Sequence, residues 1–170
     1  EALALGGTTT IRHEGRVVQS GKTAEVYHRP QHVLAAELFS EPAINLMPGR
    51  VSGTEVSFAE TVHFPLNPDL QGIAEGEYRF GVRPSHIGLV PSNDDDLELA
   101  VTVELAEISG SETFLHVSNE QFVLVLHLPG VHEYAVDSSI LIYIPTHKLF
   151  VFSADGQLIQ APSRRLGRVA

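Results

Sequence analysis

The residues of this 170-residue chain best suited to chemistry are its nine histidines, because neutral imidazole is a common metal ligand. His28 and His32 have the spacing that places two ligands on one helical face, but Pro30 lies between them and interrupts such a helix. No His-Glu-x-x-His pattern or comparable cluster occurs. The absence of cysteine excludes thiolate zinc sites, disulfides and a cysteine nucleophile. We therefore expect no metal site and assign the histidines structural or surface roles.

The sequence patterns of several other reactions are also missing. There is no Gly-x-x-x-x-Gly-Lys-Ser/Thr phosphate loop, no Gly-x-Gly-x-x-Gly and no Gly-x-Ser-x-Gly. Carboxylates are numerous, but no second motif brings two of them together as a glycosidase requires. We expect no catalytic residue and no cofactor in this chain.

Two segments combine polar side chains with turn residues. In residues 81–87, Arg83 precedes Pro84, and this pair fixes an extended entry into a turn while the guanidinium remains able to bind carboxylates or carbonyl oxygens. Residues 107–117 join two predicted strands through a turn at Gly110. The residues alone favour turn stabilisation as the role of both segments.

Charge is distributed unevenly along the chain. The net charge is −10 at neutral pH, yet residues 1–50 are neutral, whereas residues 51–163 hold three cations against sixteen carboxylates, a net −13. A surface of this sign repels phosphate backbones, which argues against nucleic-acid binding. The apolar content of 43% is typical of a globular protein of one domain or two small ones, and no apolar run approaches the length of a membrane helix.

The first fifty residues predict a mixture of elements. Residues 11–18 have the pattern of a hairpin with Gly15 in its turn. A helix is predicted to begin with Thr23 as its N-cap and run to Tyr27, and Pro30 can open a second helix. The chain starts at Glu1, inside an apolar stretch and without an initiator methionine, so we expect it to be the interior of a longer protein.

From about residue 50 onward the pattern is that of strands. Residues 97–105 alternate between apolar and polar side chains, as expected of a strand with one buried face. Residues 122–126 and 140–144 are apolar on both faces, which predicts central strands. Residues 149–159 predict a hairpin around Asp155-Gly156. Short strands at these intervals indicate a small antiparallel barrel or sandwich.

Several segments, in this order and spacing, resemble the C-terminal part of the ATP-binding subunits of bacterial ABC importers, especially the sugar-importing group related to the maltose and glycerol-3-phosphate systems. Residues 13–21 are similar to the family's Asp-Gly-Arg-Ile-Val-Gln-x-Gly hairpin, and residues 25–30 to its Glu-x-Tyr-x-x-Pro helix. Residues 39–49 resemble its Phe-Ile-Gly-x-Pro-x-Met-Asn-x-Leu-Pro-Gly linker. Residues 83–86 match Arg-Pro-Glu-His, and residues 110–117 match Gly-x-Glu-Thr-x-x-His-Val. Residues 6–10 and 40–41 depart from the family's pattern.

The resemblance implies a mainly β fold, an oligonucleotide-binding-like (TOBE) antiparallel barrel preceded by a small α+β remnant of the ATPase domain. It divides the chain into residues 1–44 as the end of the ATPase domain, 45–163 as the barrel and 164–170 as a basic tail. The phosphate loop, magnesium site, signature motif and switch histidine would all lie upstream of Glu1, so ATP and magnesium are expected only in the parent protein.

The implied role is regulation and stabilisation of a dimer, without catalysis by this region itself. The expected partners are a second copy, the permease subunits through the ATPase domain, and a regulatory protein, at the cytoplasmic face of the cell membrane. Arg83 and Glu112 are predicted as polar anchors of the contact between copies, within a surface organised by Arg83, His86, Gly110, Glu112, Thr113 and His116.

Barrels of this kind also serve two other classes of function. Similar barrels in related importers bind oxyanions, so the alternative function is a small-ligand module that binds an oxyanion or a sugar. The net charge of −13 in the barrel region weighs against an anion site that depends on many basic side chains. Nucleic-acid binding needs basic and aromatic grooves, which these acidic strands lack, and no nucleic-acid partner is expected.

Overall fold

The structure, a computed structural model, describes residues 6–70 and 72–162. The N-terminal elements are β1 (Thr8–His13), β2 (Arg16–Lys22), α2 (Thr23–His28) and α3 (Val33–Leu38). The remainder of the described chain is built from short strands and three 3-10 turns. These are β3 (Asn45–Ser52), β4 (Glu55–Phe58), β5 (Val62–Pro65), η1 (Pro68–Leu70), β6 (Gly76–Val82), η2 (Pro84–His86), β7 (Leu97–Ser109), β8 (Glu112–Ser118), β9 (Val123–Pro129), β10 (Ser139–Ile144), η3 (Thr146–Lys148), β11 (Phe150–Ser153) and β12 (Leu158–Gln160).

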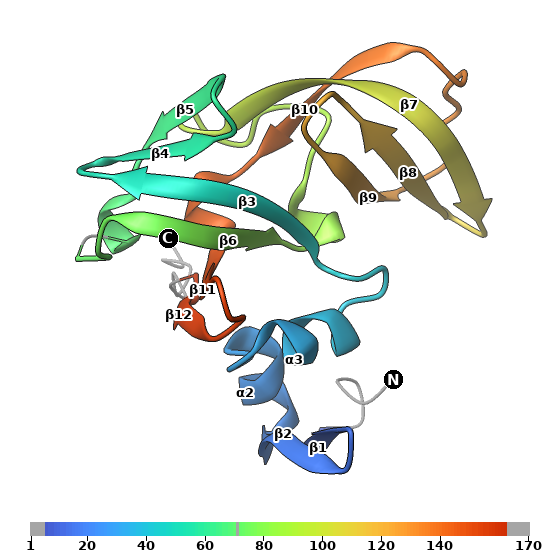
Figure 1. Cartoon of the computed structure of the whole chain (residues 1–170). Coiled ribbons are helices and arrows are strands. Elements are labelled where there is room, and N and C mark those ends of the chain that lie inside the picture. Colours follow the sequence, from blue (N-terminus) through green and yellow to red (C-terminus); the bar gives the residue numbers. More distant parts are fainter. Residues whose placement is uncertain (1–5, 71, 163–170) are drawn as a thin grey trace, which may run out of the picture.

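The strands form three antiparallel sheets. β1 and β2 pair alone, a four-stranded sheet has the order β10-β7-β8-β9, and a six-stranded sheet has the order β12-β11-β6-β3-β4-β5. The two larger sheets curve around a shared apolar core as a half-barrel, and the N-terminal elements lie below β11 and β12 (Figure 1). The predicted mainly β fold of oligonucleotide-binding type is confirmed.

The alternation predicted for residues 97–105 produces β7 and holds as far as Val103, and the strand continues to Ser109. The expectation that Leu105 is buried is wrong, because a register shift between Val103 and Leu105 turns this side chain outward, where it is 46% exposed. Its apolar members Leu99, Val101 and Val103 are buried and face the six-stranded sheet across the core. Because successive side chains of a strand point to opposite faces, the intervening residues Glu98, Ala100 and Thr102 point away from the core. The two-residue alternation along β7 therefore separates its core-facing side chains from its outward-facing ones.

The prediction that residues 122–126 and 140–144 form central strands is wrong, because β9 and β10 are the two edges of the four-stranded sheet. Other groups cover part of each edge. The side-chain amide of Asn45 donates to the carbonyl oxygen of Val125 and accepts from its N–H, at 2.9 and 2.8 Å. On β10, Tyr143 exchanges two backbone hydrogen bonds with Gly88. These contacts replace a neighbouring strand at points where an exposed edge would invite aggregation.

The N-terminal elements largely agree with the sequence. The β1–β2 hairpin and both helices are present. Thr23, however, is the first residue of α2 and not its N-cap, which is Lys22. The Thr23 hydroxyl instead hydrogen-bonds to the carbonyl oxygen of Gly7 and approaches that of Gly6, so it ties the helix to the chain before β1. β3 begins at Asn45, the predicted boundary, but the division into domains stays a prediction, and residues 1–5 and 164–170 lie outside the described residues.

The loop between β11 and β12 joins the N-terminal elements to the β-rich region. The backbone of Val33 donates to Gly156, and Leu158 donates to Gln31. The imidazole of His32 lies directly over Gly156, where an added Cβ would be 2.8 Å from the ring. Gly156 has φ +92°, so glycine is required there for both conformation and space.

Candidate functional site

The sequence-predicted residues fall into two groups on different sheets. Arg83 and His86 follow the end of β6, whereas Gly110, Glu112, Thr113 and His116 belong to the β7–β8 hairpin of the four-stranded sheet. None of the hydrogen bonds or ion pairs described for these residues joins one group to the other. We therefore describe two surfaces rather than one composite site.

Arg83 is buried, with 2% of its surface exposed, and its contacts lie within the chain. Its guanidinium donates to the carbonyl oxygens of Tyr27 and Phe39, at 2.5 and 3.3 Å. It also stacks over the Tyr27 ring at 3.8 Å from the centroid. Burial lowers the pKa of Arg83, while the nearby Tyr27 opposes that shift. Arg83 thus joins the ends of α2 and α3 to the half-barrel.

His86 lies one turn further along, in η2. Its Nδ1 is buried and has no hydrogen-bond partner among the residues that the structure describes. Burial, reinforced by the positive charges of Lys148 and Arg83 and by His147, lowers the pKa of His86 to about 4. The imidazole is therefore neutral at pH 7.

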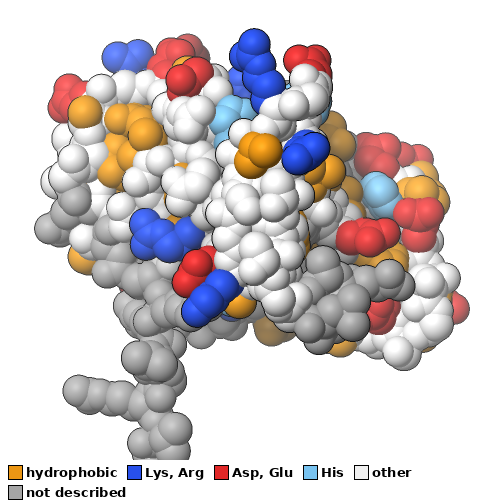
Figure 2. Space-filling model, turned by 90° about the horizontal axis from the view of Figure 1, so that it is seen from below, with side chains coloured by type: hydrophobic (Ala, Val, Ile, Leu, Met, Phe, Trp, Pro, Cys, Tyr) orange, Lys and Arg blue, Asp and Glu red, His pale blue; other side chains and the backbone are white. Residues whose placement is uncertain are grey.

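The second group belongs to the outer face of the four-stranded sheet, which we define by its side chains Leu105, Glu107, Glu112, Phe114, His116, Val123, Val125, His127 and Leu141. Two histidine–glutamate contacts cross this face. His116 Nε2 lies 2.8 Å from Glu107 Oε2, and His127 Nε2 lies 3.1 Å from Glu112 Oε1. Figure 2 shows acidic side chains, with a histidine among them, gathered at one end of the molecule as seen from below.

Apolar side chains lie between these polar pairs. Leu105 and Leu141 are each 46% exposed and Val123 is 79% exposed. The Phe114 ring stacks on His127 with centroids 4.7 Å apart. The outer face is therefore a sheet surface of mixed apolar and hydrogen-bonding character that no other described element covers.

Gly110 and Thr113 stabilise the hairpin that carries the outer face, but their side chains are not part of that face. Gly110 occupies the β7–β8 turn at φ +61°. Thr113 is buried, and its hydroxyl donates to Gly130 and accepts from the His132 N–H. The threonine thus fixes the loop after β9 against the hairpin.

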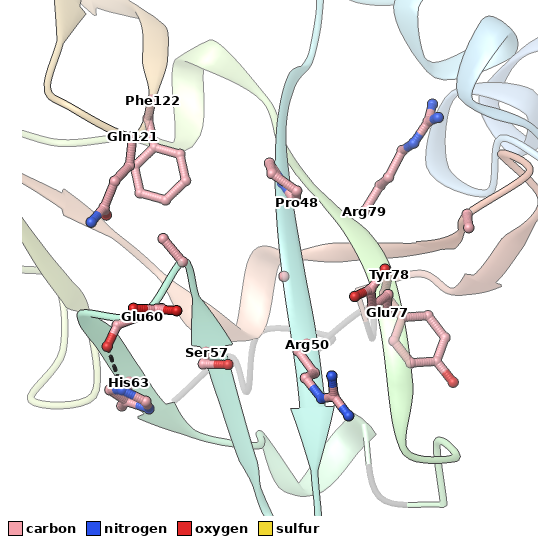
Figure 3. A pocket seen from close by; sticks show the side chains of 13 residues that line it. Pro48, Arg50, Ser57, Glu60, His63, Glu77, Tyr78, Arg79, Gln121 and Phe122 are labelled. Atoms are coloured by element: carbon pink, nitrogen blue, oxygen red, sulfur yellow. Dashed lines mark hydrogen bonds between the residues drawn. The ribbon is translucent and has the colours of Figure 1, made fainter.

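A cleft of about 840 Å³ opens on the six-stranded sheet. Arg50 on β3 is paired with Ser57 on β4 and Glu77 on β6, and Ser57 with His63 on β5, so these side chains form a row across four strands. Figure 3 shows this row together with Gln121 and Phe122, which precede β9. Cations, carboxylates and an aromatic ring together form a polar cleft.

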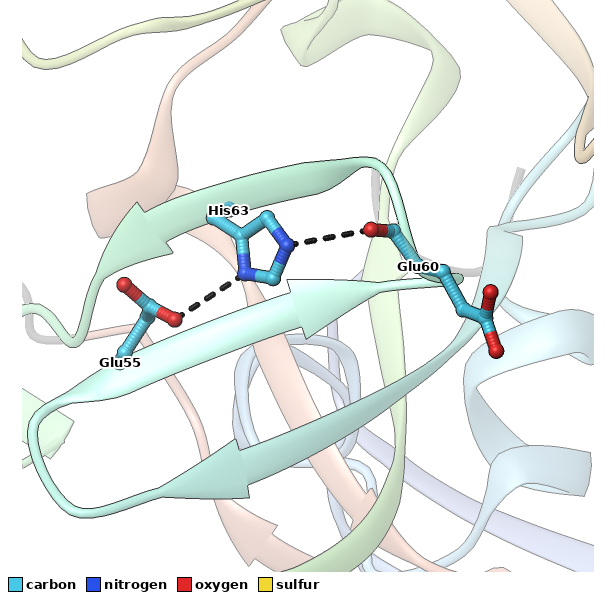
Figure 4. Close-up of polar contacts among 3 residues, drawn as sticks. All are labelled: Glu55, Glu60 and His63. Carbon is cyan, nitrogen blue, oxygen red and sulfur yellow. Dashed lines mark hydrogen bonds and ion pairs between the residues drawn. The ribbon is translucent and has the colours of Figure 1, made fainter.

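His63 is held at one end of that cleft. Its Nδ1 lies 3.0 Å from Glu55 Oε1 and its Nε2 lies 3.2 Å from the backbone oxygen of Glu60 (Figure 4). Both ring nitrogens therefore have partners. Among residues 6–70 and 72–162, no group of three or more His, Cys, Asp or Glu side chains is placed to hold a metal ion. None of the described helices has the length and apolar character needed to cross a membrane.

The sequence interpretation missed Tyr27, Asn45 and His127. Each forms its contact with a residue far away in the sequence or on a neighbouring strand: Tyr27 with Arg83, Asn45 with Val125, and His127 with Glu112. The alternation of Val123, Val125 and His127 along β9 could have placed His127 on a solvent face. No local signal identifies the partners of Tyr27 or Asn45.

Comparison with known proteins identifies ATP-binding proteins of solute transporters among the relatives of the chain, and no family model matches it. The chain is 30% identical, over 158 residues, to the sulfoquinovosyl glycerol transport ATP-binding protein of Agrobacterium fabrum; the match covers 91% of this chain and 44% of that protein. It is 29% identical over 160 residues to the sn-glycerol-3-phosphate import ATP-binding protein of Paraburkholderia xenovorans, covering 89% of this chain and 43% of the relative.

The maltose/maltodextrin import ATP-binding protein of Photorhabdus laumondii is 29% identical over 168 residues, with 94% of this chain and 45% of the relative covered. The chain thus spans less than half the length of the curated relatives it matches. The resemblance predicted from its motifs is confirmed: this chain is homologous to part of the ATP-binding subunits of ABC importers for sugars and glycerol phosphates.

Proposed function

We propose that this chain is the regulatory, dimer-stabilising region of the ATP-binding subunit of an ABC importer for carbohydrates or related solutes. The observation that supports the proposal best is the uncovered outer face of the four-stranded sheet. Leu105, Leu141 and Val123 expose apolar surface there, beside the Glu107–His116 and Glu112–His127 contacts. Core-like apolar area with polar groups around it is the usual composition of a surface that binds another protein.

The occupant of this face is a second copy of the chain. In a twofold contact the same patch is used by both subunits, so it must be complementary to itself. The outer face meets this requirement because it carries carboxylates and imidazoles in alternation, which lets a glutamate of one copy meet a histidine of the other. Contact between these regions keeps two ATPase domains at a high effective concentration, so that their closure becomes an intramolecular step.

In the longer protein, ATP hydrolysis with magnesium would drive solute uptake through permease subunits, at the cytoplasmic face of the membrane. The chain itself carries no catalytic role in this proposal. A regulatory protein that binds the half-barrel would act by holding the ATPase domains apart.

Light scattering of the 170-residue chain tests the proposal. The measurement compares the wild type with Leu105→Glu on the outer face and with Ile159→Glu on β12, a matched control because Ile159 is 44% exposed. Over about 1 µM to 1 mM, where contacts of moderate strength dissociate, we expect the wild type and Ile159→Glu to dimerise. Leu105→Glu should stay monomeric, because each copy brings a charge into the contact. A wild type that is strictly monomeric at the highest concentration contradicts the proposal for the isolated region.

The polar cleft supports a second candidate function, a small-ligand module. Arg50, Glu77, Gln121 and the ring of Phe122 are side chains of the kinds that bind sugars, and the cleft of about 840 Å³ is of ligand size. Calorimetry with a panel of sugars, molybdate and sulfate tests this candidate. Heat that is abolished by Arg50→Ala supports it, and a panel without heat removes it.

A further inference from the structure

A second cleft, of about 510 Å³, lies where the N-terminal elements meet the half-barrel. From the N-terminal side it is lined by Tyr27 of α2 and by Arg29, which follows that helix. From the half-barrel it is lined by four side chains of η2, η3 and β11 and of the residue after β6: Arg83, His86, Lys148 and Phe150. The cleft is thus built from both sides of the predicted boundary at residue 45. Ligand sites occur preferentially at such junctions, and the volume is within the usual range for small molecules.

Three of the eleven lysines and arginines of the chain line this cleft. Residues 51–163 contain only three lysines and arginines against sixteen carboxylates, and two of the three, Arg83 and Lys148, line it. Arg29 from the N-terminal side is the third cation there, and Glu25 is the only carboxylate among the lining residues that the structure describes. In a region of net charge −13, this concentration of positive charge favours a negatively charged occupant.

None of these three cations forms an ion pair with a carboxylate within residues 6–70 and 72–162. Arg83 donates to two carbonyl oxygens, but a guanidinium has five N–H donors. His86 lines the same cleft, is neutral and has a buried Nδ1 without a partner. The two carbonyl oxygens and the Tyr27 ring compensate part of the burial of Arg83, but they carry no net charge, so the positive charge of the cleft has no ion-paired carboxylate among the described residues.

We propose that this cleft binds a phosphate dianion, either free or as the phosphate group of a small monoester. Its anionic oxygens contact Lys148 and Arg29, as ammonium and guanidinium groups recognise phosphate, and the buried guanidinium of Arg83 adds positive charge beneath them. The rings of Tyr27 and Phe150 supply apolar walls for the carbon body of a monoester. The bound group cross-links α2 to the half-barrel and so strengthens the junction that Arg83 already forms.

This proposal is independent of dimer formation, since every lining residue belongs to one copy. The test is calorimetry and thermal unfolding of the 170-residue chain with inorganic phosphate, glucose 6-phosphate and glucose. We expect one or both phosphates to bind and to raise the melting temperature, and glucose to do neither. Stronger binding of glucose 6-phosphate identifies a monoester as the ligand, whereas equal binding identifies the phosphate group itself.

Variants locate the site. Lys148→Ala should weaken phosphate binding by about tenfold, the effect of losing one charge-assisted hydrogen bond. Arg29→Ala, at an exposed position, should weaken it by about threefold, and binding should also weaken as salt is added. Arg16→Ala on β2, an exposed arginine that lines neither cleft, is the matched control and should leave the affinity unchanged. The proposal is overturned if neither phosphate binds, if glucose binds as well as its phosphate, or if Lys148→Ala has no effect.

Discussion

Replacement of Arg83 by alanine should loosen the junction between the N-terminal elements and the half-barrel. The substitution removes both hydrogen bonds to the carbonyl oxygens of Tyr27 and Phe39 and the stacking over the Tyr27 ring. It also leaves space where a side chain that is 2% exposed had packed. The two carbonyl oxygens lose a partner that water does not readily replace in this position.

The magnitude follows from these contacts. Hydrogen bonds from a charged donor contribute about 1.5–3 kcal/mol each, and a desolvated cation–π contact about 2 kcal/mol. The cost of burying the guanidinium, several kcal/mol, is recovered when it is removed. The net loss in the free energy of unfolding should therefore be about 3–4 kcal/mol. Arg83→Lys, which keeps the charge but loses the fork geometry, should lose about 1–2 kcal/mol.

Urea unfolding followed by far-ultraviolet circular dichroism measures the change, which suits a chain without tryptophan. Arg50→Ala serves as control, because this exposed arginine should matter by less than about 0.5 kcal/mol. Limited proteolysis gives a second readout, in which Arg83→Ala should speed cleavage between α3 and β3. The reasoning is refuted if Arg83→Ala unfolds within about 0.5 kcal/mol of the wild type and is cleaved at the same rate.

Three further predictions concern single residues. Because the pKa of His86 in the folded chain is lowered to about 4, the unfolded chain binds more protons between about pH 6.5 and 4. The free energy of unfolding of the wild type should therefore fall as pH drops through this window. In His86→Gln this fall should be smaller by about 1–2 kcal/mol, a value that allows for the partial exposure of His86. Asn45→Ala should cost about 1–3 kcal/mol and speed hydrogen exchange at the Val125 amide. Gly49→Ala should cost about 1–3 kcal/mol in urea unfolding, since its Cβ would lie 2.7 Å from the Phe58 ring.

Local signals in the sequence predicted most elements of the fold. The alternation of residues 97–105 identified β7, and the Asp155-Gly156 turn identified the β11–β12 hairpin. The position of a strand within its sheet was not predictable in the same way. Residues 122–126 are apolar on both faces, yet β9 is an edge strand. Apolar residues can occupy this edge because one face and one edge of β9 are covered by elements distant in sequence. Apolar content reports burial and does not report which strand lies beside which.

The candidate sites show the same limit. The Arg-Pro motif identified Arg83 as a residue with a role, but its partner Tyr27 is 56 positions away, so the sequence did not indicate that the guanidinium turns inward. Glu112 and His116 were placed on a strand pair by their spacing, whereas the outer face also depends on β9 and β10. The second cleft combines α2 with η2, η3 and β12, and only the fold brings these cations together.

The proposal that the outer face joins two copies is tested most directly by cross-linking through single introduced cysteines, because the chain has none of its own. Ser139 on β10 is exposed beside the outer face, two residues before Leu141, and Ser52 on β3, which is also exposed, is the control. With a short bifunctional maleimide, Ser139→Cys should yield covalent dimers and Ser52→Cys only monomers. Equal cross-linking of the two variants, or none for Ser139→Cys at concentrations where the chain is dimeric, would contradict the account.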